Sequence, residues 1–118
     1  MAMIDPMPKR DRPQGCCPIK AVRPLPKAHS QRLSVMMKAL SDPTRLEILR
    51  IVAAQPGPVC ACDIVDRFKL SQPTISHHLK TLSKAGLLIS RRAGLWSFYT
   101  PDPDGLERID ALRSLISD

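Results

Sequence analysis

Aromatic side chains are scarce in this sequence of 118 residues, which contains one Trp, one Tyr and two Phe. Proteins that bind single-stranded nucleic acid commonly stack its bases on aromatic side chains, so the low content argues against that mode of binding. Long apolar runs are missing too, since no segment approaches the roughly 20 residues that cross a bilayer. Residues 1–30 also lack the apolar core of a signal peptide. We therefore expect a cytoplasmic protein with no membrane partner.

Acidic residues are few beside the basic ones, with 11 Asp and Glu against 18 Lys and Arg. The resulting net charge of +7 and isoelectric point near 9.7 favour a polyanionic partner, most simply nucleic acid. The sequence shows no phosphate-binding loop, no pair of carboxylates at catalytic spacing and no nucleophile with a nearby base. We therefore expect a binding protein of one domain and not an enzyme.

Proline is abundant, and many of the 12 prolines lie near the N-terminus. Prolines at this density prevent a regular helix or a central strand, so residues 1–27 are predicted to be a flexible basic arm. Residues 28–118 are predicted to form the folded domain. The arm carries an adjacent pair of cysteines, Cys16 and Cys17.

Helical signals dominate the first half of the predicted domain. Apolar residues recur at helical spacing from about His29 to Leu40, and Asp42 followed by Pro43 is typical of a helix start. A third, short helix is expected from about Cys60 to Phe68. The residues expected to be buried in the second helix are Leu46, Leu49, Ile51 and Val52.

The segment from Leu70 to Leu87 is the most informative one. Ser71 suits an N-cap, Gly86 suits the left-handed position after the helix, and an apolar stripe lies between them at Ile75, Leu79 and Leu82. The other side carries small hydrogen-bonding residues and lysines, which can contact base edges and phosphates. This helix follows the third one after a short link. Two helices joined in this way, with a polar hydrogen-bonding face on the second, predict a helix-turn-helix.

The pattern changes after this helix. The segments 87–92 and 95–100 are rich in β-forming residues and are separated by Ala93 and Gly94, which predicts a hairpin wing. Arg91 and Arg92 near its tip are placed to contact phosphate or the minor groove. A last amphipathic helix, with no later element to cover it, is expected to pack on the first helix and on a second subunit. The expected fold is therefore mostly α, a winged helix-turn-helix of five helices and a two-stranded wing, in a homodimer.

Three segments together resemble the ArsR/SmtB family of metal-responsive bacterial repressors: ALSDPTRLEIL at 39–49, VCACDI at 59–64 and LSQPTISHHLKTLSKAGLL at 70–88. The resemblance covers roughly residues 33–100. It implies a dimeric repressor that binds duplex operator DNA and releases it when a toxic ion binds. Carried over by position, the resemblance places Ser71, Gln72, Thr74, Ser76 and His77 on the DNA-facing part of the family's recognition helix. With Lys80 on the polar face of the same helix and Arg91 and Arg92 on the wing, these are the expected DNA-binding residues.

Four cysteines are the candidate ligands of the inducing ion: Cys16, Cys17, Cys60 and Cys62. The N-terminal end of the predicted third helix favours the thiolate form of Cys60 and Cys62. On a regular helix their side chains point about 200° apart, so the first turn must be distorted if both bind one ion. The arm pair could close over them from either subunit. Sulfur donors select thiophilic ions.

The resemblance leaves the inducer open. Arsenic-type members often have a third cysteine at the position of Val65, so the arm must supply the missing ligand for As(III) or Sb(III), which we favour as inducers. Four sulfur ligands would suit Cd(II), Pb(II) or Zn(II) instead. A thiol redox sensor remains a further alternative, because the same cysteines could respond to oxidants. A thiol-dependent arsenate reductase is disfavoured for want of a catalytic motif.

Overall fold

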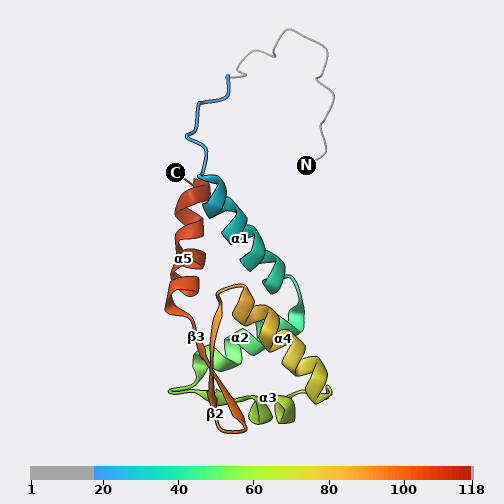
Figure 1. Cartoon of the computed structure of the whole chain (residues 1–118). Coiled ribbons are helices and arrows are strands. Elements are labelled where there is room, and N and C mark those ends of the chain that lie inside the picture. Colours follow the sequence, from blue (N-terminus) through green and yellow to red (C-terminus); the bar gives the residue numbers. More distant parts are fainter. Residues whose placement is uncertain (1–17, 118) are drawn as a thin grey trace.

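The computed structural model describes residues 18–117, which form five helices and three strands (Figure 1). The predicted winged helix-turn-helix, mostly α with a β-hairpin, is confirmed. In chain order the elements are α1 Lys27–Leu40, α2 Pro43–Ala54, β1 Val59–Cys60, α3 Ala61–Arg67, α4 Gln72–Lys84, β2 Leu88–Ala93, β3 Trp96–Pro101 and α5 Pro103–Ser117.

The core lies where α2, α3 and α4 meet the sheet. Ile75, Leu79 and Leu82 of α4 are completely buried, as the helical spacing predicts. In α2 the prediction was partly wrong, because Ile48 is buried at 0% exposure whereas Leu46 is 44% exposed. The apolar residues of α2 cover more than one face, so their spacing alone does not define which side packs on α4.

Both ends of α4 follow their sequence signals. The Ser71 hydroxyl accepts a hydrogen bond from the Thr74 backbone N–H at 3.4 Å, which caps the helix. At the C-terminus Gly86 has φ +79°, its N–H donates to the Ser83 carbonyl, and the Leu87 N–H donates to the Leu82 carbonyl. These two bonds make a Schellman motif, which fixes where α4 stops and where the wing begins.

The wing belongs to a sheet with one more strand than the sequence suggested. The strand order is β1-β3-β2 and both pairings are antiparallel. Strand β1 has only two residues, with Val59 opposite Tyr99 and Cys60 opposite Phe98. A strand this short has no periodicity of its own, so its pairing depends on β3, far along the chain.

The hairpin turn lies one residue later than predicted. Ala93 pairs with Trp96, which leaves Gly94 and Leu95 as the two turn residues. Gly94 has φ +63° and no other residue between 87 and 102 has a positive φ, which is the pattern of a type II′ turn with glycine first. Leu95, expected within the strand, is therefore at the end of the hairpin.

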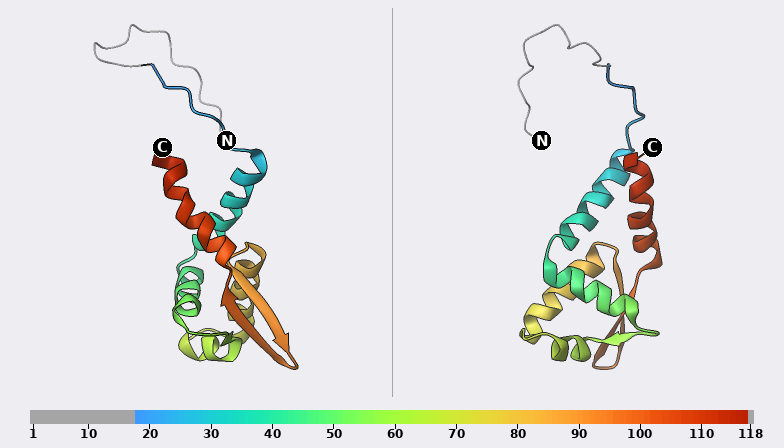
Figure 2. Two further views of the ribbon diagram at one scale, coloured as in Figure 1. Left: turned by 90° about the vertical axis from the view of Figure 1, so that its left-hand side faces the viewer. Right: turned by 180° about the vertical axis from the view of Figure 1, so that it is seen from behind.

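Helices α1 and α5 extend from the other end of the domain and lie near each other only along part of their length (Figures 1 and 2). Helix α1 begins at Lys27, two residues before the predicted start and at the end of the predicted arm. In α5 only Gly105 is buried, and Leu115 and Ile116 are 39% and 77% exposed. Much of the apolar stripe predicted on α5 is thus uncovered in the single chain. No helix within residues 18–117 is long and apolar enough to cross a membrane.

Candidate DNA interface and thiol site

The predicted DNA-binding residues all have exposed side chains. On α4 they lie on the side opposite the buried stripe of Ile75, Leu79 and Leu82. The N-terminal end of α4, α3 and the end of the hairpin are found together at one end of the molecule (Figure 1). The exposed set comprises Ser71, Gln72, Thr74, Ser76, His77, Lys80, Arg91 and Arg92.

Not all of these polar groups are equally available. The Ser71 and Thr74 hydroxyls lie 2.8 Å apart and bond to each other, and Ser71 also caps α4. Both therefore contribute to the start of the helix. Gln72, Ser76 and His77 make no side-chain hydrogen bond within the described residues, so their donors and acceptors are open to base edges.

The two wing arginines are on strand β2, close to the turn. Arg92 pairs with Ser97 and Arg91 with Phe98, so their side chains leave opposite faces of the hairpin. Within the described residues neither forms a salt bridge. Their charges are therefore available to phosphate groups on either side of the wing.

Arg45 is a residue that the sequence argument missed. Its Nε donates to the Ala39 carbonyl at 2.6 Å, at the C-terminal end of α1, and its NH1 is 3.4 Å from His78 Nδ1 on α4. The Asp42 carboxylate caps α2 by accepting hydrogen bonds from the backbone N–H groups of Arg45 and Thr44, and these bonds hold the pKa of the carboxyl below its ordinary value. One guanidinium thus connects α1 to α4, and only the folded structure brings these groups together.

Cys60 and Cys62 are separated by one residue in sequence and lie close together in space. Cys60 is extended, with φ −71° and ψ 139°, and the helix begins only at Ala61. Its sulfur accepts a hydrogen bond from the Cys62 N–H at 3.4 Å, so the Cys60 thiol lies over the first turn of α3. The departure from helical geometry that both thiols would need to bind one ion is therefore present at Cys60.

The two thiols differ in environment. Cys60 is buried and Cys62 is exposed. The side-chain contact with Cys60 raises the pKa of the Cys62 thiol, and the carboxylate of Asp63 acts in the same direction. At Cys62 the neighbouring Cys60 sulfur and the Asp63 charge thus act against the thiolate expected from the helix N-terminus.

Known proteins are similar to this chain over the helices and the strand that carry most of these residues. The family described as "Bacterial regulatory protein, arsR family" matches residues 42–90, from the N-cap of α2 to β2. The arsenical resistance operon repressor of Staphylococcus xylosus is 39% identical over 87 residues, which cover 74% of this chain and 82% of that protein. The chain belongs to the ArsR family. It is a transcriptional regulator with a DNA-binding winged helix-turn-helix, and not an enzyme.

Two further relatives of this ArsR-family protein are informative. A homodimeric winged helix-turn-helix domain of Mycobacterium bovis, described as a possible ArsR-family regulator, superposes with a TM-score of 0.62 at 27% identity, covering 84% of this chain and 91% of that one. The cadmium resistance regulatory protein CadC homolog of Staphylococcus aureus is 30% identical, covering 76% of this chain and 74% of that protein. The relatives thus include proteins named for arsenic and for cadmium.

The thiol pair alone is an incomplete ion site. Among residues 18–117 no group of three or more His, Cys, Asp or Glu side chains is placed to hold a metal ion. The two thiols fit thiophilic ions by their chemistry, but As(III) commonly takes three sulfur ligands and the divalent ions four. The other predicted ligands, Cys16 and Cys17, lie outside the described residues.

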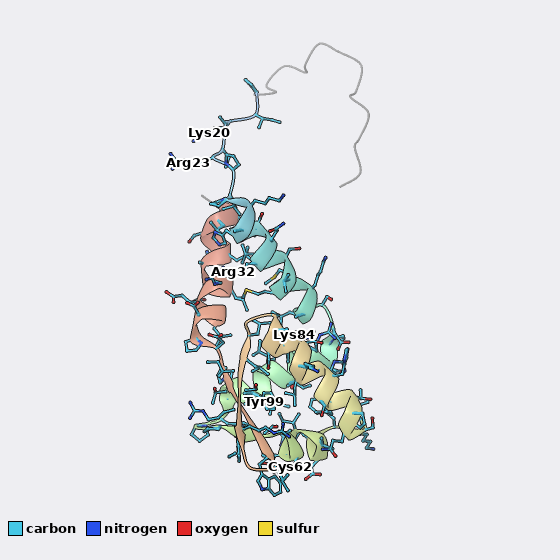
Figure 3. The ribbon with its side chains drawn as sticks, viewed as in Figure 1. Lys20, Arg23, Arg32, Cys62, Lys84 and Tyr99 are labelled. Atoms are coloured by element: carbon cyan, nitrogen blue, oxygen red, sulfur yellow. The ribbon has the colours of Figure 1, made fainter. Side chains whose placement is uncertain are left out.

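The described end of the arm is far from the thiols. Figure 3 shows Lys20 and Arg23 at one end of this ArsR-family chain and Cys62 at the other. Residues 18–26 precede α1, which is about 21 Å long at 1.5 Å per residue. Fully extended, those residues could span about 30 Å, so an arm could fold back along its own α1 or reach another subunit.

Proposed function

We propose that this protein is a homodimeric repressor that binds operator DNA and releases it when arsenite or antimonite binds to cysteine sulfur. Cys60 and Cys62 would hold the ion together with Cys16 and Cys17 of the arm. The observation that carries the proposal is the hydrogen bond from the Cys62 N–H to the Cys60 sulfur, which brings both cysteines together at the start of α3, inside the helix-turn-helix.

The position of the thiols suggests how ion binding would affect DNA binding. Helix α3 packs against α4, and residues 68–71 join the two directly. Sulfur ligands gathered around one ion would draw the first turn of α3 toward the arm and change the orientation or mobility of α4. A coupling of about 1–3 kcal/mol is usual between two sites of an allosteric protein, and it corresponds to a 5- to 150-fold change in operator affinity.

Arsenite and a divalent metal differ in what happens to the thiol protons when the ion binds. Arsenite in neutral solution is the uncharged As(OH)₃, and each thiol that replaces a hydroxide transfers its proton to the departing water. A divalent metal instead requires thiolates and releases a proton from every thiol it binds. Binding of a divalent metal should therefore be more sensitive to pH than binding of arsenite.

This difference predicts distinct pH profiles for the two ions. Between neutral and weakly acidic pH, the affinity for arsenite is expected to stay nearly constant. The affinity for Cd(II) should fall by about tenfold per pH unit for each proton released. Isothermal titration calorimetry in buffers of different ionisation enthalpy measures both the affinity and the protons released. An arsenite affinity that falls as steeply as that for Cd(II) would contradict the preference for the metalloid.

Support for a homodimer comes from the uncovered apolar surface of α1 and α5. Val35 on α1 is 51% exposed, and Leu115 and Ile116 on α5 are 39% and 77% exposed. These helices lie at the end of the molecule away from the wing (Figure 2). A second subunit packed there would cover apolar surface and leave both DNA-binding ends free.

Two substitutions on α4 separate base contacts from phosphate contacts. Gln72→Ala is expected to weaken operator binding by about 10- to 100-fold and to relax the sequence preference, since a bidentate base contact contributes about 1–3 kcal/mol. Lys80→Ala is expected to weaken binding to all duplexes and to lower the salt dependence by about one unit of slope. Fluorescence anisotropy over a series of salt concentrations distinguishes the two effects.

The direct test is a titration of the protein–operator complex with arsenite, with hydrogen peroxide in a parallel assay. Release by arsenite under reducing conditions supports the proposal, whereas release by peroxide alone supports a thiol redox sensor. X-ray absorption at the edge of the bound element then counts the sulfur neighbours. Three short bonds to arsenic support the metalloid site, and four bonds to cadmium or lead would favour a divalent inducer. An affinity for the operator that no thiophilic ion changes would refute the proposed regulation.

A further inference from the structure

The Arg45 guanidinium of α2 joins the end of one helix to the middle of another. Its Nε donates to the Ala39 carbonyl at 2.6 Å and its Nη2 to the Lys38 carbonyl at 3.5 Å, both at the C-terminal end of α1. Its Nη1 donates to His78 Nδ1 on α4 at 3.4 Å and lies 3.8 Å from the Asp42 carboxylate. Only 17% of the Arg45 side chain is exposed. These contacts fix the planar guanidinium between α1 and α4.

Apolar packing alone leaves the junction of α1 and α4 partly open. The C-terminal end of α1 lies beside α4 (Figure 1), and Met36 is buried there in the core. Next to it lies a groove of about 300 Å³, with Val35 on the α1 side and Thr81 and Ala85 on the α4 side. Interlocking side chains fix the angle between two helices, and a groove lacks such contacts. The hydrogen bonds of Arg45 thus provide directional contacts where the packing is loose.

We propose that Arg45 is a positioning residue for operator binding: by holding the end of α1 and His78 of α4 together, it fixes α4 relative to the helix on which a second subunit packs. This inference rests on the proposed homodimer, in which α1 and α5 carry the contact between subunits. The distance and angle between the two copies of α4 then depend on the junction of α1 and α4 in each subunit.

A loose junction would affect only the combined binding of two recognition helices. Two such helices that enter successive major grooves must be about 34 Å apart, in a fixed relative orientation. A dimer that does not hold this arrangement beforehand loses conformational freedom when it binds, and its affinity falls. Binding of one recognition helix to one half-site needs no such arrangement. The affinity for a single half-site is therefore expected to be independent of Arg45.

The contact with α4 requires an unprotonated nitrogen on His78. An arginine only donates hydrogen bonds, so Nδ1 of the imidazole must accept. An imidazolium would turn an N–H toward the guanidinium and place two positive charges side by side. The titratable and charged groups near the ring or along the groove are Asp42 and Arg45 of α2, Lys38 of α1, and His77 and Lys84 of α4. Of these groups only Asp42 would stabilise an imidazolium, so acidification is expected to loosen the junction.

Replacing His78 with leucine tests the contact most directly, because the bonds of Arg45 to α1 stay in place. The duplex is one with two half-sites, which the full-length wild type selects from a pool of random sequence. We expect His78→Leu to bind it at least about tenfold more weakly, since a hydrogen bond to a charged group is lost. On a duplex cut to one half-site it should bind as the wild type does. Changing the spacing of the half-sites by one base pair should weaken the variant less than the wild type.

His78→Asn separates the acceptor from its titration. The amide oxygen of asparagine can take the place of Nδ1 and gains no proton in this range, so the variant should keep the wild-type affinity for two half-sites near pH 8. Between about pH 8 and pH 5, where an imidazole changes its charge, the wild type should lose this affinity and His78→Asn should retain it. The ratio to the single half-site at each pH removes the direct effect of His77, which is on the DNA-facing side of α4.

Arg45→Gln removes the other partner and should reproduce the effect of His78→Leu, and the double variant should lose little more than either single one. Arg50→Gln is the matched control, because it removes the same charge from the same helix. Arg50 is 69% exposed and pairs with Glu47 of α2 at 2.8 Å. It should leave the spacing preference and the ratio between the two duplexes unchanged. If Arg45→Gln does not fold, as judged by circular dichroism, His78→Leu decides the question.

Three results would overturn the inference. The first is a His78→Leu variant that binds two half-sites as tightly as the wild type. The second is an equal loss on one half-site and on two, which would mean that Arg45 only supports α4 locally. The third is a pH profile that His78→Asn shares with the wild type. A failure of the proposed homodimer is distinguishable, because the wild type would then sediment as a monomer before any variant is compared.

Discussion

Replacing Cys62 with serine is expected to leave operator binding intact and to remove most of the response to arsenite. Cys62 is exposed, so the substitution should cost little stability. Serine has nearly the same shape but does not provide a sulfur ligand. The loss should equal the whole allosteric effect, about 5- to 150-fold in operator affinity. The measurement is operator affinity with and without arsenite, by gel shift or anisotropy.

Cys60→Ser is expected to have the same effect on induction. It should also preserve the fold, because serine is a better N-cap than cysteine at the position where Cys60 accepts the Cys62 N–H. Asp63→Asn is the matched control, since it removes a charge in the same turn and leaves both thiols in place. The thiol pair would be ruled out as the inducer site if Cys62→Ser still released DNA at the wild-type arsenite concentration.

The double variant Cys16→Ser with Cys17→Ser tests the arm separately. It should keep DNA binding and reduce induction, because the described residues alone provide too few ligands. Mixing this variant with Cys60→Ser and Cys62→Ser subunits shows which route the arm takes. Recovered induction in mixed dimers would mean that one subunit's arm serves the other's α3, and no recovery would mean that it serves its own.

Gly105→Ala is expected to destabilise the protein by at least about 3 kcal/mol, which is at the upper end of the cost of overpacking. Gly105 is the only buried residue of α5, and a Cβ atom there would collide with the Gly86 carbonyl. Because the colliding group is backbone in the Schellman motif that ends α4, no side chain can rotate to relieve the clash. The melting temperature should fall by roughly 10–20 °C for a domain of this size.

Gly57→Ala provides the control for that substitution. A Cβ atom at Gly57 has no neighbour within 4 Å and its φ is not positive, so stability should change by less than about 0.5 kcal/mol. Thermal unfolding followed by circular dichroism compares the two variants. If Gly105→Ala melted with the wild type, α5 would not be held against the end of α4 as the structure has it.

The helix-turn-helix could be predicted because its signals are local. A hydroxyl at Ser71, a stripe at Ile75, Leu79 and Leu82, and a glycine at Gly86 act within a few residues of one another, and the structure has each in its predicted role. The same is true of the N-cap at Asp42. Where several apolar residues competed for one buried face, as in α2, the local pattern misplaced Leu46.

At the thiol site, the sequence predicted the candidate residues but not their geometry. The sequence identified Cys60 and Cys62 as candidates by their chemistry. It did not show that Cys60 is held extended by its pairing with Phe98, or that its sulfur lies over the Cys62 N–H. Nor did it show that the Cys60 side chain raises the pKa of the Cys62 thiol, which acts against the thiolate expected from the helix N-terminus.

By itself, the sequence determined the family, the order of the helices and the exposed polar side of α4, and it identified the cysteines on which the proposed response to thiophilic ions rests. These properties depend on residue type and on spacing within one element. Only the tertiary structure decided the pairing of β1 with β3, the connection of α1 to α4 through Arg45, the exposure of Leu95 and the close approach of Gly105 to Gly86. Each of these depends on packing between separate elements, which no local pattern of residues specifies.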